Sequence, residues 1–91
     1  MVTIDVGRVV DERGLHVLLK QELCFPDFYG MNWDAFWDAI TGLVEIPDHL
    51  RFLGWDRLVD VVPGGAGKLQ EALDRYREMY RSQFVAEYGQ Q

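Results

Sequence analysis

Two aspartates spaced four residues apart are the first groups in this sequence that could do chemistry. Asp34 and Asp38 would share one face of a helix, and Thr41 continues the row. Paired carboxylates serve in acid–base catalysis and in glycoside hydrolysis, and they also bind cations. From spacing alone, a solvated polar face is the simplest interpretation, because charged side chains are mostly exposed.

The position of Asp38 argues against a helix face selected only for stability. Like charges at i and i+4 destabilise a helix by roughly 0.2–0.5 kcal/mol. The helix dipole favours an acid in the first turn, where Asp34 lies, and disfavours one in the C-terminal half, where Asp38 lies. A lysine at position 38 would suit stability better. We therefore expect the counter-charge of Asp38 to come from another molecule.

The formal charge of −6 has a single origin in the sequence. Between Gln21 and Leu50 there is no Lys or Arg, whereas six acids occur there: Glu22, Asp27, Asp34, Asp38, Glu45 and Asp48. The remaining nine acids match the nine Lys and Arg residues elsewhere. A field concentrated in this way repels nucleic acid and attracts basic partners. We expect neither a nucleic-acid nor a membrane partner.

Other chemistry has little support in the sequence. His16, His49 and Cys24 are isolated and show no metal-ligand spacing, so we expect neither a metal nor another cofactor. We expect His16 to pack near the second helix and Cys24 to be a small buried residue. The glycine-rich stretch 63–68 lacks a phosphate-binding pattern, and its Pro-Gly-Gly predicts a turn.

Length and composition predict a single domain over residues 1–91 in the cytoplasm. One cysteine cannot form an internal disulfide, which argues against a stapled secreted scaffold. No apolar run approaches the ~20 residues of a membrane span. The first five residues also lack the basic and apolar regions of a signal peptide.

The elements that would position the aspartates follow from periodicity and from local start and stop signals. Asp11 and Asn32 are good N-caps for helices, and Pro26 ends the first of them. The helix 33–41 has an apolar face of Trp33, Phe36, Trp37 and Ile40, and we expect Gly42 to follow it in a left-handed conformation. The remaining expected elements are strands near 2–7, 50–53 and 84–88, a short helix at 55–62, and a helix from about 66 with Leu69, Leu73, Tyr76 and Tyr80 on one face. Strands that alternate with helices predict an α/β fold with a small parallel sheet.

Three consecutive stretches resemble the barstar family of intracellular ribonuclease inhibitors. They read Gly-Leu-His-Val-Leu-Leu-Lys-Gln-Glu-Leu from residue 14, Phe-Pro-Asp-Phe-Tyr-Gly-Met-Asn-Trp-Asp from residue 25, and Ala-Phe-Trp-Asp-Ala-Ile-Thr-Gly-Leu-Val-Glu from residue 35. The likeness is densest over 14–47 and continues more weakly through Tyr-Arg-Glu at 76–78. It implies a three-stranded parallel sheet packed against about four helices. It also implies an inhibitory surface on the second helix and the loop before it.

Carried over by matching position, the resemblance assigns roles to individual residues. Asp38 would be the central acid entering the nuclease site, near its phosphate-binding Arg and His groups, and Asp34 would pair with a second basic group. The other predicted contacts are Phe28, Tyr29, Asn32, Trp37, Thr41, Gly42 and Leu43, with Glu45 and Glu78 as rim charges. The expected partner is a basic microbial ribonuclease of the extracellular type.

This chain departs from the family pattern at three positions. Phe28 stands in the place of a tyrosine, Met31 in that of an acid, and Leu43 in that of a tryptophan. The target could therefore be a different microbial ribonuclease of the same broad type. An alternative is an acidic, immunity-type binding module for another basic protein, and an enzyme with an aspartate dyad ranks third.

Overall fold

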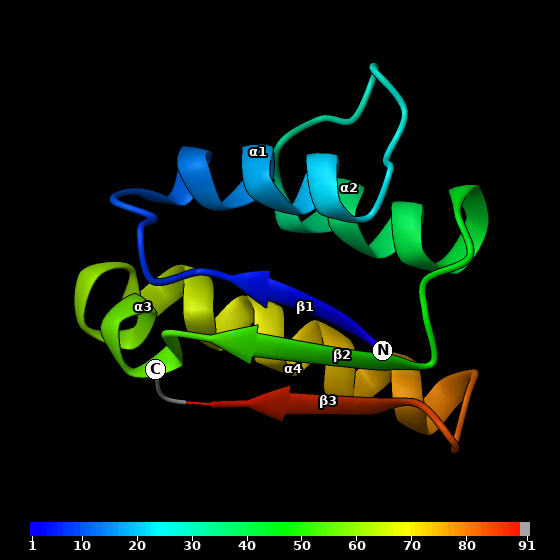
Figure 1. The fold of residues 1–91 in the computed structure, drawn as a ribbon. Helices are drawn as coiled ribbons and strands as arrows, with labels where there is room; N and C mark the ends of the chain where they lie inside the picture. Colours follow the sequence, from blue (N-terminus) through cyan, green and yellow to red (C-terminus); the bar gives the residue numbers. More distant parts are fainter. Residues whose placement is uncertain (90–91) are drawn as a thin grey trace.

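Three parallel strands and the helices that join them make up the fold (Figure 1). The computed structural model describes residues 1–89, so the last two residues of the predicted domain lie outside the described range. In chain order the elements are β1 (Val2–Asp5), α1 (Glu12–Glu22), α2 (Trp33–Asp38), the π-helix η1 (Ala39–Leu43), β2 (His49–Leu53), α3 (Trp55–Val61), α4 (Pro63–Met79) and β3 (Val85–Tyr88). The strand order is β1-β2-β3, and both pairings are parallel. The predicted α/β fold with a three-stranded parallel sheet and four helices is confirmed.

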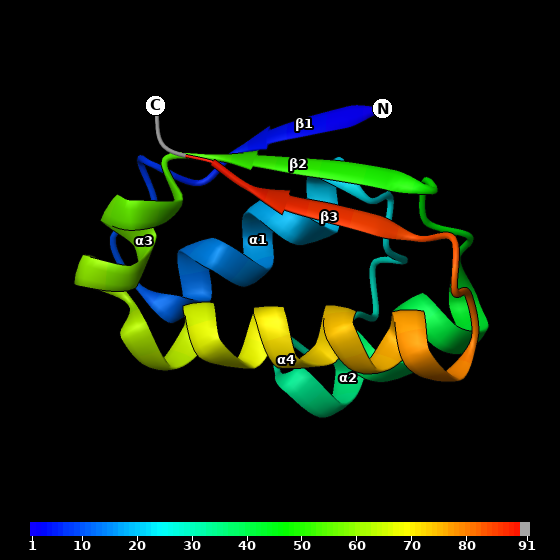
Figure 2. The ribbon, with the colours of Figure 1, turned by 90° about the horizontal axis from the view of Figure 1, so that it is seen from below.

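The helices of residues 1–89 all lie on one side of the sheet, and no part of that range covers the other face (Figure 2). The strand sequences alternate accordingly. Phe52 pairs in register with Ile4, and both are fully buried under the helices. Arg51, which points to the opposite face, pairs with Thr3 and Glu87, and all three are exposed. One-sided burial therefore explains why the strands of a parallel sheet carry polar residues at every second position.

Local hydrogen bonds define both ends of the first helix. Asp11 is its N-cap, and its carboxylate accepts a hydrogen bond from the Gly14 amide at 2.7 Å. At the other end the Phe25 amide donates to the Lys20 carbonyl, which closes a Schellman-type turn through Cys24 in the left-handed region, at φ 59°. The prediction that Cys24 is buried is wrong: this turn directs its side chain to solvent.

The predicted turn at Pro63–Gly65 is also wrong, because α4 begins there. Pro63 occupies the first turn of the helix, where its missing amide hydrogen costs nothing. The chain turns one residue earlier, at Val62, with φ −132° and ψ 64°. A Cβ at Gly65 would lie 2.9 Å from Val62 and 3.3 Å from Leu15. Close packing of α4 against its neighbours, and not a turn, therefore explains this glycine.

Candidate protein-binding surface

Side-chain hydrogen bonds of Asn32 fix the start of α2, the helix that carries the two aspartates. Asn32 is its N-cap: Oδ1 accepts from the Ala35 amide at 2.7 Å, and Nδ2 donates to the Gly30 carbonyl at 3.1 Å. Phe36 is fully buried in the core, which turns Asp34 and Asp38 to the outside. The side chain of Asn32 is thus committed to positioning α2.

Asp34 and Asp38 are exposed, and neither forms an ion pair within residues 1–89. The expectation that the counter-charge of Asp38 comes from another molecule stays a prediction. Asp48, an acid of the same unbalanced segment, differs because it pairs with Arg81 from beyond α4. One of the six acids is therefore matched by the chain itself.

A rare π-helix continues α2 directly. In η1 the Val44 amide donates to the carbonyl of Ala39, five residues earlier, at 3.0 Å. The Thr41 hydroxyl donates to the Trp37 carbonyl at 2.6 Å and joins the two segments. The prediction that Gly42 is left-handed is wrong, because Gly42 lies inside η1 and Gly54 is the positive-φ glycine of residues 1–89. Single turns of π-helix are frequently found at functional sites.

The loop before α2 has one buried and one exposed ring. Phe28 is 75% exposed. Tyr29 is buried, and its hydroxyl is hydrogen-bonded to Nδ1 of His16 on α1 at 2.6 Å. The ring of His16 lies 4.3 Å from that of Trp33, between centroids, which confirms that His16 packs near the second helix. Tyr29 therefore anchors the loop from inside, while Phe28 is presented to solvent.

Two titratable groups at this anchor have shifted pKa values. Burial lowers the pKa of His16, and the nearby carboxylate of Glu12 opposes this shift more weakly. Burial also raises the pKa of Tyr29. Both groups are thus held in their neutral forms.

Met31, at φ 55°, adds a left-handed backbone directly before the N-cap.

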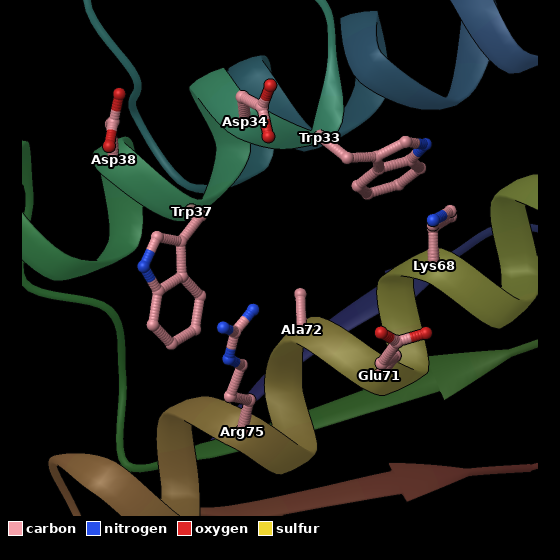
Figure 3. A pocket seen from close by; sticks show the side chains of 8 residues that line it. All are labelled: Trp33, Asp34, Trp37, Asp38, Lys68, Glu71, Ala72 and Arg75. Atoms are coloured by element: carbon pink, nitrogen blue, oxygen red, sulfur yellow. The ribbon is translucent and has the colours of Figure 1, made fainter.

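A groove runs between α2 and α4 beside the aspartates (Figure 3). Asp34, Trp37 and Asp38 line one wall, and Lys68, Glu71 and Arg75 line the other. The guanidinium of Arg75 lies over the indole ring of Trp37, 5.0 Å from its centroid. In Figure 3 these two side chains point toward each other, whereas the carboxylate of Asp38 points away from α4. Sequence reasoning missed Arg75, because α2 and α4 meet only through the tertiary fold.

A second hollow lies where η1 meets the end of α4. Thr41, Gly42, Leu43 and Glu45 line it together with Tyr76, Tyr80 and Arg81. The prediction that Tyr80 belongs to the buried face is wrong. The helix ends at Met79, and the changed backbone at Tyr80 leaves this ring 57% exposed, 6.0 Å from the ring of Trp37. The structure thus joins four of the predicted contacts with an aromatic ring that the helical pattern had assigned to the core.

The remaining predicted residue, Glu78, lies outside both hollows. It is exposed on α4 and shares a shallow depression with Asp74 and Arg75.

Among residues 1–89, no group of three His, Cys, Asp or Glu side chains could hold a metal ion. No helix of that range combines the length and apolar character of a membrane span. The arrangement consists of uncompensated carboxylates beside exposed rings, which suits the binding of a basic protein.

Comparison with known proteins agrees with this geometry. The chain matches the family described as Barstar (barnase inhibitor) over residues 1–89. It is also 34% identical over 70 residues to a Bacillus subtilis (strain 168) protein named "Putative ribonuclease inhibitor YrdF", with 77% of each chain covered. Family members are inhibitors and not enzymes, so the two aspartates are not a catalytic dyad. The sequence match and the three-stranded parallel fold together show that this chain belongs to the barstar family of ribonuclease inhibitors.

Proposed function

We propose that the chain inhibits a basic microbial ribonuclease of the extracellular type by placing the acidic face of α2 in its active site. Asp38 enters the phosphate-binding pocket, and Asp34 pairs with a second basic group at its edge. The carboxylates thereby take the place of the anionic substrate without being cleaved. The proposal places the chain in the bacterial cytoplasm, where such an inhibitor would give immunity to the nuclease.

One observation carries the proposal. The two aspartates are exposed and unpaired within residues 1–89, on a helix whose other face is anchored in the core. An acid in the C-terminal half of a helix is unfavourable for stability. Its presence without a counter-charge is explained if a cationic pocket supplies one on binding.

The flanking segments support the same assignment. Phe28 is presented by the anchored loop, and Thr41, Gly42 and Leu43 by the π-helix. In the proposed complex, these groups contribute apolar and backbone surface on the two sides of α2, which would exclude water from the charge pairs. Charge pairs that are shielded from water set the dissociation rate more than rim charges do.

The substitution Asp38→Ala tests the proposal. Removing one member of a desolvated charge pair costs about 2–5 kcal/mol of binding, a range for which barnase–barstar is itself a reference system. Inhibition should therefore weaken by roughly 30-fold to several thousand-fold, while the free energy of unfolding stays equal or rises slightly. Inhibition of RNA cleavage, measured with barnase and a panel of microbial extracellular ribonucleases, gives the first quantity, and urea denaturation gives the second.

Asp60→Ala is the matched control, because Asp60 is an exposed acid in the last turn of α3. It should leave inhibition unchanged. A loss of several kcal/mol in stability for Asp38→Ala would show that Asp38 is structural. A parent chain that inhibits no ribonuclease of the panel would favour the alternative of an immunity-type module for another basic protein. The departures at Phe28, Met31 and Leu43 are the observation that keeps this alternative in view.

A further inference from the structure

The groove between α2 and α4 already holds a cation of the chain itself. The guanidinium of Arg75 lies 5.0 Å from the centroid of the Trp37 ring. Arg75 forms no ion pair within residues 1–89, although Asp34, Asp38 and Glu71 line the same groove. Within residues 1–89, the guanidinium therefore contacts the aromatic face of Trp37, and no carboxylate lies close enough to form an ion pair with it.

The contact between Arg75 and Trp37 distinguishes the groove, which already holds a cation, from the exposed carboxylate of Asp38. The face of an indole ring attracts a cation through the ring quadrupole, and one guanidinium fills that face. A second cation brought to the groove would find the ring covered and would meet the like charge of Arg75. Lys68, on the same wall, adds to this repulsion. Asp38 points away from α4 (Figure 3), so its end of the surface remains open to a basic group.

We propose that Arg75 is a specificity-determining residue of the inhibitory surface. It admits a partner whose basic groups pair with the exposed carboxylates of Asp38 and Asp34 and which brings a neutral or acidic group over the ring of Trp37. It excludes a partner that places a further cation over Trp37. This inference rests on the proposed function, because it concerns which ribonucleases the surface accepts.

The substitution Arg75→Leu tests this role with barnase as the probe. Removing the cation should uncover the ring of Trp37 and raise the affinity for barnase at least tenfold. The control is Arg77→Leu, which removes the same charge from the same helix. Arg77 is exposed and does not line the groove, so this variant isolates the local effect from the change in net charge. The inhibition constants of both variants are measured against RNA cleavage by barnase.

A gain confined to Arg75→Leu supports the inference. Equal changes in the two variants, or no inhibition of barnase by Arg75→Leu, overturn it, because another feature would then exclude that enzyme. Neither result touches the proposed function, which is tested separately by the parent chain against the panel and by Asp38→Ala. A second measurement needs no partner. The indole N–H signal of Trp37 in an NMR spectrum should move in Arg75→Leu and stay in place in Arg77→Leu, and a signal unmoved in both would also overturn the inference.

Discussion

At the scale of single residues, His16 shows how the binding loop depends on the core. It is 1% exposed, its Nδ1 is hydrogen-bonded to the hydroxyl of Tyr29, and its Nε2 is buried with no hydrogen-bond partner among residues 1–89. An ionised imidazole here would be desolvated beside two aromatic rings, with only Glu12 to offset the charge. The anchor of the loop therefore requires the neutral form of His16.

This requirement predicts that stability falls in mild acid. The pKa of His16 is lowered in the folded chain, so the unfolded chain, with a pKa near 6.5, binds the proton first as the pH falls. Titration of His16 therefore leaves the free energy of unfolding unchanged above pH 6.5. Below pH 6.5 it lowers the free energy of unfolding by at most about 1.4 kcal/mol per pH unit, until the pKa of His16 in the folded chain is reached. Urea denaturation from pH 7.5 to 5 measures this slope. His16→Gln should remove it and His49→Gln should keep it, and a slope that survives in His16→Gln would contradict the assignment.

At the scale of elements, the π-helix contains a glycine that the fold does not need. A Cβ at Gly42 would meet no atom within 4 Å, and its φ is not positive. Glycine in a helix nonetheless costs about 0.5–1 kcal/mol relative to alanine. We expect Gly42→Ala to stabilise the free chain by about that amount. We also expect it to weaken inhibition by about 1–3 kcal/mol of binding free energy, because the added methyl would crowd the partner.

The control for this prediction is Gly64→Ala in the first turn of α4, where a Cβ would also meet nothing within 4 Å. The start of α4 lies at the opposite end of the molecule from η1 (Figure 1), so Gly64→Ala should leave inhibition unchanged. Denaturation and inhibition titrations on both variants separate the two effects. Unchanged inhibition in Gly42→Ala would remove Gly42 from the contact.

Most helix starts could be predicted from the sequence because their signals are local. Asp11 and Asn32 cap through bonds to amides three residues on, so a few adjacent letters suffice. The errors fall where tertiary packing decides. Gly65 is small because α1 and the side chain of Val62 pack closely against α4, and the π-helix replaces the expected left-handed end at Gly42. Neither the packing around Gly65 nor the π-helix can be recognised from a short window of sequence.

The site divides in the same way. Exposure of Asp34 and Asp38 follows from helical spacing, because the buried Phe36 fixes the rotation of α2. The contact between the guanidinium of Arg75 and the ring of Trp37, in contrast, involves residues that are far apart in the sequence. Helical periodicity marks a face of α4 but does not say which helix that face meets. Single-sequence reasoning therefore identified the acids and missed the cation beside them.

At the scale of the whole molecule, charge placement is less simple than the sequence indicates. Arg81 pairs with Asp48 and also donates to the Ile46 carbonyl at 3.0 Å, which ties the segment before β2 to the end of α4. Arg75 adds a positive charge to the groove beside α2. The outward field of the unbalanced segment therefore arises mainly from acids other than Asp48, including Asp34 and Asp38.

This distribution predicts how the association rate depends on salt. Attraction between separated surface charges is screened over about 8 Å at physiological ionic strength. Association with the ribonuclease identified by the panel should therefore slow by roughly tenfold or more between low and high salt. Asp34→Asn and Asp48→Asn make the same chemical change, but Arg81 already cancels most of the field of Asp48. Stopped-flow association at low salt should show the larger decrease for Asp34→Asn. A rate independent of salt would exclude steering, and equal decreases would mean that the pair with Arg81 does not shield Asp48 from the approaching enzyme.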